Sequence, residues 1–250
     1  MRSCNLCAQR RKLIKAHIIP HAFYPKGENP RSYDIRNLAP PKRIPMGHYD
    51  QKILCAVCDN ALGQWDHEAV SVLRQKSLIP VHINGVYPAD QFGNIRIVAV
   101  EEFNYYKLKL FFVSLLWRAS ITKLTYFSKV NLGPQANELR DIIVKESYLN
   151  EDEYSIFVVR YAQDFASSIG ENPRTLTIGD ATAVRFMFGG YIVYINVSNR
   201  RFPSYCEGVV LKPDSKLYML VQDIYETSVP RNALKLASGY GVPPDVRKRS

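Results

Sequence analysis

The chain has 250 residues, and 46% of them are hydrophobic, so it can bury a sizeable core and is not intrinsically disordered over most of its length. Its formal net charge of +10 favours an anionic partner, of which nucleic acid is the commonest. No apolar run is long enough to span a membrane and no export signal is present. We therefore expect a cytoplasmic protein with reduced thiols and no membrane partner.

The first 75 residues are polar and rich in turns, and they contain four of the five cysteines. Six prolines between Pro20 and Pro45 divide this stretch into loops and short strands. A helix is expected over residues 61–76, directly after Cys58. Such a segment cannot form a large core of its own, so we expect a bound metal ion to stabilise it.

The rest of the chain predicts two helices followed by a series of strands. The helices are expected at residues 103–121, where apolar side chains recur every three or four positions, and at residues 134–147. Short strands with a turn at Gly93-Asn94 precede them, over residues 81–100. Further strands are expected at residues 154–161, 174–178, 184–188, 191–197, 208–211 and 217–221, with a hairpin turn at Gly189-Gly190 and a loose basic tail over 239–250.

The cysteines form two C-x-x-C pairs, Cys4 with Cys7 and Cys55 with Cys58. Two such pairs supply four thiolates to one ion, so they predict a structural zinc site. Unliganded thiols are the alternative, and a core-poor segment argues against them. Redox-active pairs are a second alternative, but neither pair lies in a βαβ pattern. The remaining cysteine, Cys206, is expected to be a core thiol.

A knuckle, a hairpin and a helix that carries the last two ligands follow one another in the order of a treble-clef finger. The sequence thus predicts an α+β protein with two parts. Residues 1–75 would form a treble-clef zinc module, and residues 76–250 an α+β domain with a mainly antiparallel sheet, whose role the sequence does not indicate.

Between the pairs lies the segment Lys15-Ala16-His17-Ile18-Ile19-Pro20. With the flanking cysteine pairs, it resembles the HNH, or ββα-metal, endonucleases, which have C-x-x-C pairs on either side of a His-Ile-x-Pro segment. Together with residues 53–60 and Leu115-Leu116-Trp117-Arg118-Ala119-Ser120, it is similar to a set of uncharacterised bacterial HNH-like proteins. The nuclease resemblance covers about the first third of the chain.

The resemblance implies metal-dependent hydrolysis of phosphodiester bonds in DNA or RNA. His17 matches the general base that activates water, and Asp59 loosely matches a ligand of a catalytic Mg²⁺ or Mn²⁺ ion. Family members often carry Asp or His directly before the base, where this chain has Ala16. Asp66, which shares a helix face with Asp59, is a weaker choice to fill that gap. Other candidates are His21, His48, Asp50 and His67, each of which has an ordinary structural explanation as well.

Basic residues gather near the predicted site. They are Arg10, Arg11, Lys12 and Lys15 before His17, and Lys42 and Arg43 between His17 and Cys55. We expect them to contact nucleic-acid phosphates without reading sequence, although a solvated turn would look the same. The resemblance also suggests a role in defence against phage. Two alternatives stay open: a non-catalytic nucleic-acid-binding zinc finger, and a zinc-stabilised module in which the second domain binds a protein.

Overall fold

A computed structural model describes residues 2–25, 32–36, 39–44, 47–75, 77–81, 96–213 and 216–238. Within these residues the protein is built around a nine-stranded sheet in the order β3-β2-β8-β9-β10-β7-β11-β6-β5. Most neighbouring strands are antiparallel, and the exceptions are the parallel pairs β2–β8 and β11–β7. The prediction of an α+β protein with a mainly antiparallel sheet is confirmed. The strands are β2 (Tyr33–Arg36), β3 (Ala39–Arg43), β5 (Ile79–Val81), β6 (Arg96–Val100), β7 (Ile156–Tyr161), β8 (Ile169–Ile178), β9 (Ala181–Phe188), β10 (Tyr191–Asn196) and β11 (Leu217–Gln222).

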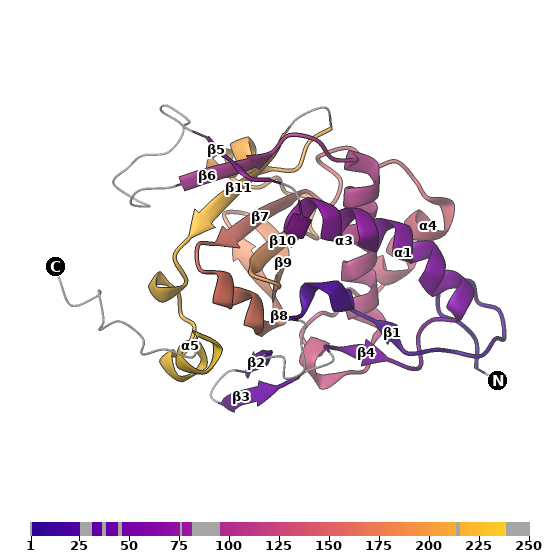
Figure 1. Cartoon of the computed structure of the whole chain (residues 1–250). Coiled ribbons are helices and arrows are strands. Elements are labelled where there is room, and N and C mark those ends of the chain that lie inside the picture. Colours follow the sequence, from indigo (N-terminus) through magenta and orange to yellow (C-terminus); the bar gives the residue numbers. More distant parts are fainter. Residues whose placement is uncertain are drawn as a thin grey trace.

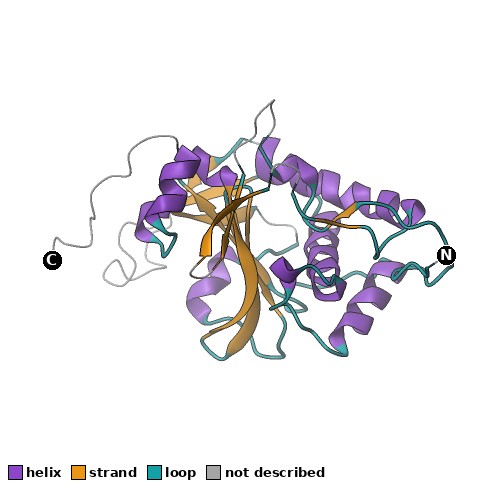
Figure 2. Cartoon of the chain, turned by 90° about the horizontal axis from the view of Figure 1, so that it is seen from below, coloured by secondary structure: helices purple, strands orange, loops and turns teal. Residues whose placement is uncertain are grey.

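Helices cover both faces of this sheet (Figure 2). One face packs against α1 (Ala56–Val70), α3 (Tyr105–Ile121) and α4 (Gln135–Lys145), and the other against α5 (Arg231–Ser238) and several 3-10 turns. Strand β9 shows how the sequence serves both layers: Val184 and Phe186 point to the first core, and Ala183 and Met187 to the second. Side chains alternate along a strand, so a strand with apolar residues at nearly every position lies between two layers.

Helix α3 is the centre of the first layer. It is apolar nearly all round, which is the pattern of a helix buried on every side, and its leucines and phenylalanines are almost completely inaccessible. The side chain of Asn104 caps its N-terminus by accepting a hydrogen bond from the backbone of Lys107 at 3.0 Å. Helix α1 packs against α3 (Figure 1), so the helix that follows the second cysteine pair is anchored on the main core.

The N-terminal segment contributes to the same body as the rest of the chain. Strands β1 (Ala16–His17) and β4 (Tyr49–Asp50) pair in a small sheet of their own, with His17 opposite Tyr49. Between them the chain crosses to the large sheet, where β2 and β3 form one edge. One continuous core runs from Cys4 to Met219. The expected boundary at residue 75 therefore does not separate two cores.

Other predicted elements differ in their limits. Helix α1 begins at Ala56, five positions before the expected start, and is followed by a π-helical turn, Ser71–Gln75. The strand expected at residues 208–211 is wrong: Ser204–Val209 is a 3-10 helix whose buried side chains, Cys206 and Val209, pack in the second core, and Val210 makes an isolated bridge to Phe157.

Two further features of the sequence compare directly with the structure. The hairpin turn at Gly189-Gly190 is confirmed, with both glycines at positive φ (60° and 87°). The predicted Gly93-Asn94 turn and the C-terminal tail lie outside the described residues. Within the described part of the chain, no helix has the length and apolar character that crossing a membrane requires.

Candidate metal centre and adjoining cleft

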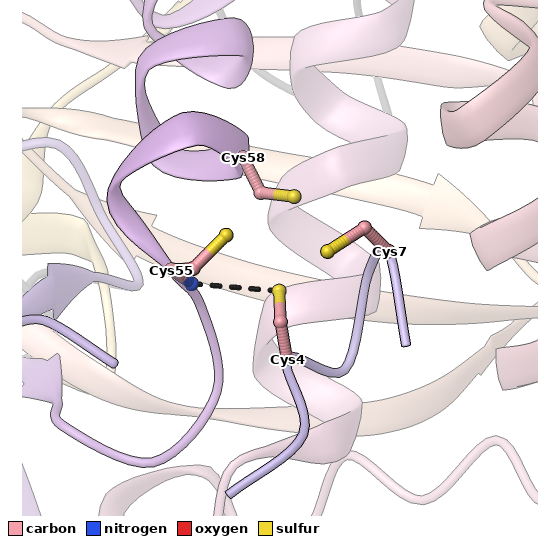
Figure 3. A group of neighbouring side chains, drawn as sticks. All are labelled: Cys4, Cys7, Cys55 and Cys58. Carbon is pink, nitrogen blue, oxygen red and sulfur yellow. Dashed lines mark hydrogen bonds between the residues drawn. The ribbon is translucent and has the colours of Figure 1, made fainter. Parts of the chain in front are cut away.

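The four paired cysteines converge on one point. Cys4 and Cys7 come from the turn near the N-terminus, while Cys55 immediately precedes α1 and Cys58 lies in its first turn (Figure 3). Their sulfur atoms all lie within 4.8 Å of one another. Zinc with bonds of about 2.3 Å holds four sulfurs about 3.8 Å apart, so a small contraction brings them into place. The four cysteines could therefore hold a zinc ion.

Backbone hydrogen bonds bring the two pairs together. The amide of Ala8 donates to the Cys4 carbonyl at 2.9 Å and closes the first turn, with Ala8 itself at a φ of 59°. The amide of Asn5 donates to Ile53 at 2.9 Å, and that of Ile14 donates to Leu54 at 3.0 Å. Ile53 and Leu54, directly before the second pair, are thus held beside the turn of the first pair and the segment that follows it.

The electrostatics of the cluster fit a cation. Burial raises the pKa of Cys58 far above its usual range, and the neighbouring cysteine sulfurs add to this effect. Burial also opposes ionisation of Cys55, but hydrogen bonds from Cys58 and the other cysteines lower its pKa to about 7. The group accommodates one thiolate readily, whereas four thiolates together need a bound positive charge.

A cleft of about 390 Å³ lies beside this centre, between β1 with the 3-10 turn His21–Phe23 on one side and α1 on the other. The α1 residues that line the cleft lie on one face of the helix, because Asn60, Gly63, Asp66 and His67 follow Asp59 by one, four, seven and eight positions. An added Cβ at Gly63 meets nothing within 4 Å, so the middle of this wall is open. The polar side chains that line the cleft are His17, His21, Asp59, Asn60, Asp66 and His67.

Asp59 is the carboxylate best placed to receive a cation in this cleft. No hydrogen-bond donor among the described residues contacts its side chain. Partial burial raises its pKa; Arg118 opposes this rise, Asp66 adds to it, and His17 opposes it. A half-buried carboxylate with no hydrogen-bond donor and a neighbouring like charge gains from a bound metal ion. His17, Asp59 and Asp66, which the sequence analysis selected, all line this cleft.

Arg118 on α3 contacts both walls of the cleft, the β1 side through His17 and the α1 side through Asp66. Its guanidinium donates to both carboxylate oxygens of Asp66, at 2.7 and 3.1 Å, and to the backbone carbonyl of His17 at 3.1 Å. The side chain of Arg118 is 1% exposed, and that of Asp66 is 21% exposed. This bidentate pair fixes the His17 strand against α1. The His17 ring in turn lies 5.4 Å from that of His21 and 6.1 Å from that of Tyr49, centroid to centroid.

Two other candidates, His48 and Asp50, lie away from the cleft, and Ala16, at the position before His17 where a ligand was missing, contributes nothing to it. Ala16 is fully buried, because it alternates with His17 along β1 and points into the core. The imidazole of His48 is hydrogen-bonded to Asp34 at 2.8 Å and stacks on Tyr126. Asp50 accepts hydrogen bonds from Thr122 and from the backbone of Lys52. His48 and Asp50 are thus part of the packing between β4, the large sheet and the residues after α3.

The predicted basic residues are placed around the site and do not line it. The amine of Lys15 lies 5.3 Å from the centre of the Tyr49 ring, and that ring is 6.1 Å from the His17 ring. Arg10 pairs with Ser3 in the turn near the cysteines, and Lys42 and Arg43 lie on the edge strand β3. Their contact with nucleic acid stays a prediction.

The sequence analysis did not select Asn60, Gly63 or Arg118 for the site. Arg118 did carry a signal, because a charged residue inside an otherwise apolar helix requires a buried partner. Comparison of the chain with protein-family models, with curated proteins and with solved structures finds no match.

Proposed function

We propose that this protein is a metal-dependent endonuclease of the HNH type, with a treble-clef zinc centre, that hydrolyses phosphodiester bonds in DNA. The observation that carries the proposal is the cleft in which the His17 imidazole faces the Asp59 helix, both held by elements that the cysteine cluster joins. The resemblance of residues 4–60 to HNH nucleases supports the same chemistry.

In this proposal His17 accepts a proton from a water molecule, and the resulting hydroxide attacks the phosphorus. The bond from phosphorus to the 3′ oxygen breaks, so the products carry a 5′ phosphate and a 3′ hydroxyl. Arg118 keeps the carbonyl of His17 in place, so that the imidazole does not drift from the phosphate. Asp66 acts through Arg118 as a positioning residue.

A divalent cation, Mg²⁺ or Mn²⁺, would be held by Asp59 and would stabilise the charge that develops on the phosphate and the leaving oxygen. Within the described residues, the four cysteines form the group whose ligating atoms are close enough to hold an ion, all within 4.8 Å of one another. The cleft side chains form no such group among the described residues, which suits a cation that keeps several waters and shares the substrate's phosphate oxygens. His21, Asn60 and His67 remain available for the ligand position that Ala16 leaves vacant.

The test compares wild type with His17→Ala on supercoiled plasmid, with Mg²⁺ and Mn²⁺ at matched concentrations. We expect a loss of nicking of about 100-fold or more, with zinc content and thermal stability unchanged. Gln64→Ala is the matched control, because Gln64 is exposed on α1 and does not line the cleft. Equal nicking by wild type and His17→Ala would place the activity elsewhere or in a contaminant.

The buried Ala16 favours a second candidate, a nucleic-acid-binding zinc module that has lost catalysis. This candidate predicts salt-dependent DNA binding but no nicking with either ion. A protein-interaction module, the third possibility, predicts no salt-dependent DNA binding at all. A binding titration at two salt concentrations, run beside the plasmid assay, separates the three.

A further inference from the structure

A second hollow of about 290 Å³ adjoins the cleft. It is bounded by the π-helical turn after α1, by the end of β7 and by the β9–β10 turn. Arg74 connects the two hollows, since it lines the second and its guanidinium donates to the carbonyl of Ala22 at 2.5 Å. Ala22 in turn lines the cleft beside His21. The two hollows are therefore neighbours along one surface.

Two arginines converge in this second hollow. Burial raises the pKa of the Tyr191 phenol, but Arg160 and Arg74 both lie near enough to the hydroxyl to lower it. Asp164 is the one acidic residue among the described lining residues, and its oxygen is 3.7 Å from Arg160. The Asp164 side chain is 98% exposed, so water screens this pair and leaves the hollow positively charged.

The rim of the hollow is fixed by close packing. The Tyr191 hydroxyl donates to the carbonyl of Leu73, which ties the sheet to the turn that carries Arg74. A Cβ at Gly189 would lie 2.9 Å from the Phe23 ring, so this glycine turn is pressed against the 3-10 helix that carries His21. The distance between the cleft and the arginines is thus set by folded elements on both sides.

We propose that this hollow, lined by Arg74 and Arg160, binds a phosphate of the nucleic-acid strand whose neighbouring phosphodiester lies in the His17 cleft. The inference rests on the proposed endonuclease function and extends its substrate contact onto the large sheet. Guanidinium groups match phosphate oxygens in charge and geometry, and contacts of this kind fix the register of a strand without reading its bases.

The test measures binding of a fluorescent DNA oligonucleotide to the His17→Ala protein, so that cleavage does not interfere. Arg160→Gln is compared with Arg174→Gln, a matched control because the Arg160 and Arg174 side chains are 31% and 35% exposed and both are paired to an acid. We expect Arg160→Gln to weaken binding several-fold and to lower the salt slope by about 1, with Arg174→Gln unchanged. A neutral methylphosphonate at the contacted position should weaken binding to the Arg160 protein but not to Arg160→Gln.

Equal affinity and salt slope in the two variants, or no DNA binding by the parent protein, would overturn the inference. The inference would also be overturned if inorganic phosphate raised the melting temperature as much as the oligonucleotide does, because the hollow would then bind a free anion. Failure of the endonuclease proposal gives a different result. In that case the wild type, with His17 intact, nicks no plasmid, but Arg160→Gln still lowers the affinity for DNA. If the wild type nicks and Arg160→Gln binds and nicks equally well, the endonuclease proposal stands and this inference falls.

Discussion

Arg118 shows how a single buried residue links parts of the chain that are far apart. It contacts the carbonyl of His17, 101 positions earlier, and the carboxylate of Asp66, 52 positions earlier. The guanidinium also donates to the carbonyl and hydroxyl of Ser114, one turn before it. Nearly all its donors are used inside the protein, so the charge is compensated in the core.

We expect Arg118→Met to lower the free energy of unfolding by about 3 kcal/mol, because it leaves Asp66 facing the core without its partner. The value is at the low end for buried pairs, since Asp66 is partly exposed. Urea denaturation measures the change. The double variant Arg118→Met/Asp66→Asn should recover part of the loss, because it removes both charges. A single variant as stable as the wild type would show that the pair has no structural role.

Lys109 gives a pH-dependent prediction. Its side chain is 1% exposed and donates to the carbonyl of Tyr154 at 3.1 Å. Burial lowers its pKa to about 7, with the nearby acids Glu153, Glu151 and Asp152 opposing the fall. The unfolded chain, with a lysine pKa near 10.4, binds more protons than the native state between these values. Lys109 therefore costs stability below pH about 7, and this cost is lost as the pH rises towards 10.

Lys109→Met should accordingly be more stable than the wild type at pH 6 to 7, and the difference should shrink as the pH approaches about 10. Thermal melts of the two proteins across this range provide the measurement, and their difference cancels the titration of other groups. If the difference in stability between the two proteins did not change with pH, Lys109 would titrate normally.

At the scale of elements, α1 carries Cys58 of the cysteine cluster in its first turn and also forms one wall of the cleft. The residues of that wall recur on one face, and Gly63 lies among them with open space above it. A glycine inside a helix weakens it, so its presence here is best explained by the room that it leaves. The helix can therefore be altered at this position without touching any polar group.

Gly63→Ala should raise the free energy of unfolding by up to about 1 kcal/mol and keep DNA binding, since its Cβ meets nothing. Gly63→Leu should keep the fold but fill the cleft, and so reduce nicking and weaken DNA binding at least tenfold. Chemical denaturation, plasmid nicking and oligonucleotide binding are measured on both variants. If Gly63→Leu binds and cuts as well as Gly63→Ala, the substrate does not enter this cleft.

At the scale of the whole molecule, the cysteine cluster belongs to the same core as the central helices. Loss of zinc should therefore loosen the entire chain in one transition, and not only its first third. The two tryptophans are suitable reporters, because Trp65 lies on α1, Trp117 lies on α3, and both are buried.

Single-tryptophan proteins, made by Trp117→Phe or Trp65→Phe, should melt at the same midpoint and shift together when zinc is chelated. We expect one zinc ion per chain by elemental analysis, and Cys55→Ala should lose it. Cys206→Ala should retain it, because Cys206 is buried in the second core away from the cluster. An earlier transition at Trp65 alone would reveal a separate N-terminal module, as the sequence first suggested.

Local patterns in the sequence determined several features. The two C-x-x-C pairs identified the cluster, since their ligand spacing is set by a short turn. The apolar periodicity of residues 103–121 and the Gly189-Gly190 turn also predicted their elements, because helix packing and hairpin geometry depend on near neighbours. His17 was selected by its place between the cysteine pairs and by resemblance, and it does face Asp59 across a cleft.

Contacts distant in sequence were decided only by the tertiary structure. Nothing local indicates that β2 and β3 join the large sheet, because strand pairing depends on which edge is free once the core has formed. The tertiary structure also directs Ala16 and His48 away from the cleft. It brings Arg74 and Arg160 to the same side chain, that of Tyr191. Arg118 could be recognised as a buried charge from its helix, but its partners were fixed by the packing of α1 on α3, a choice that involves the whole core.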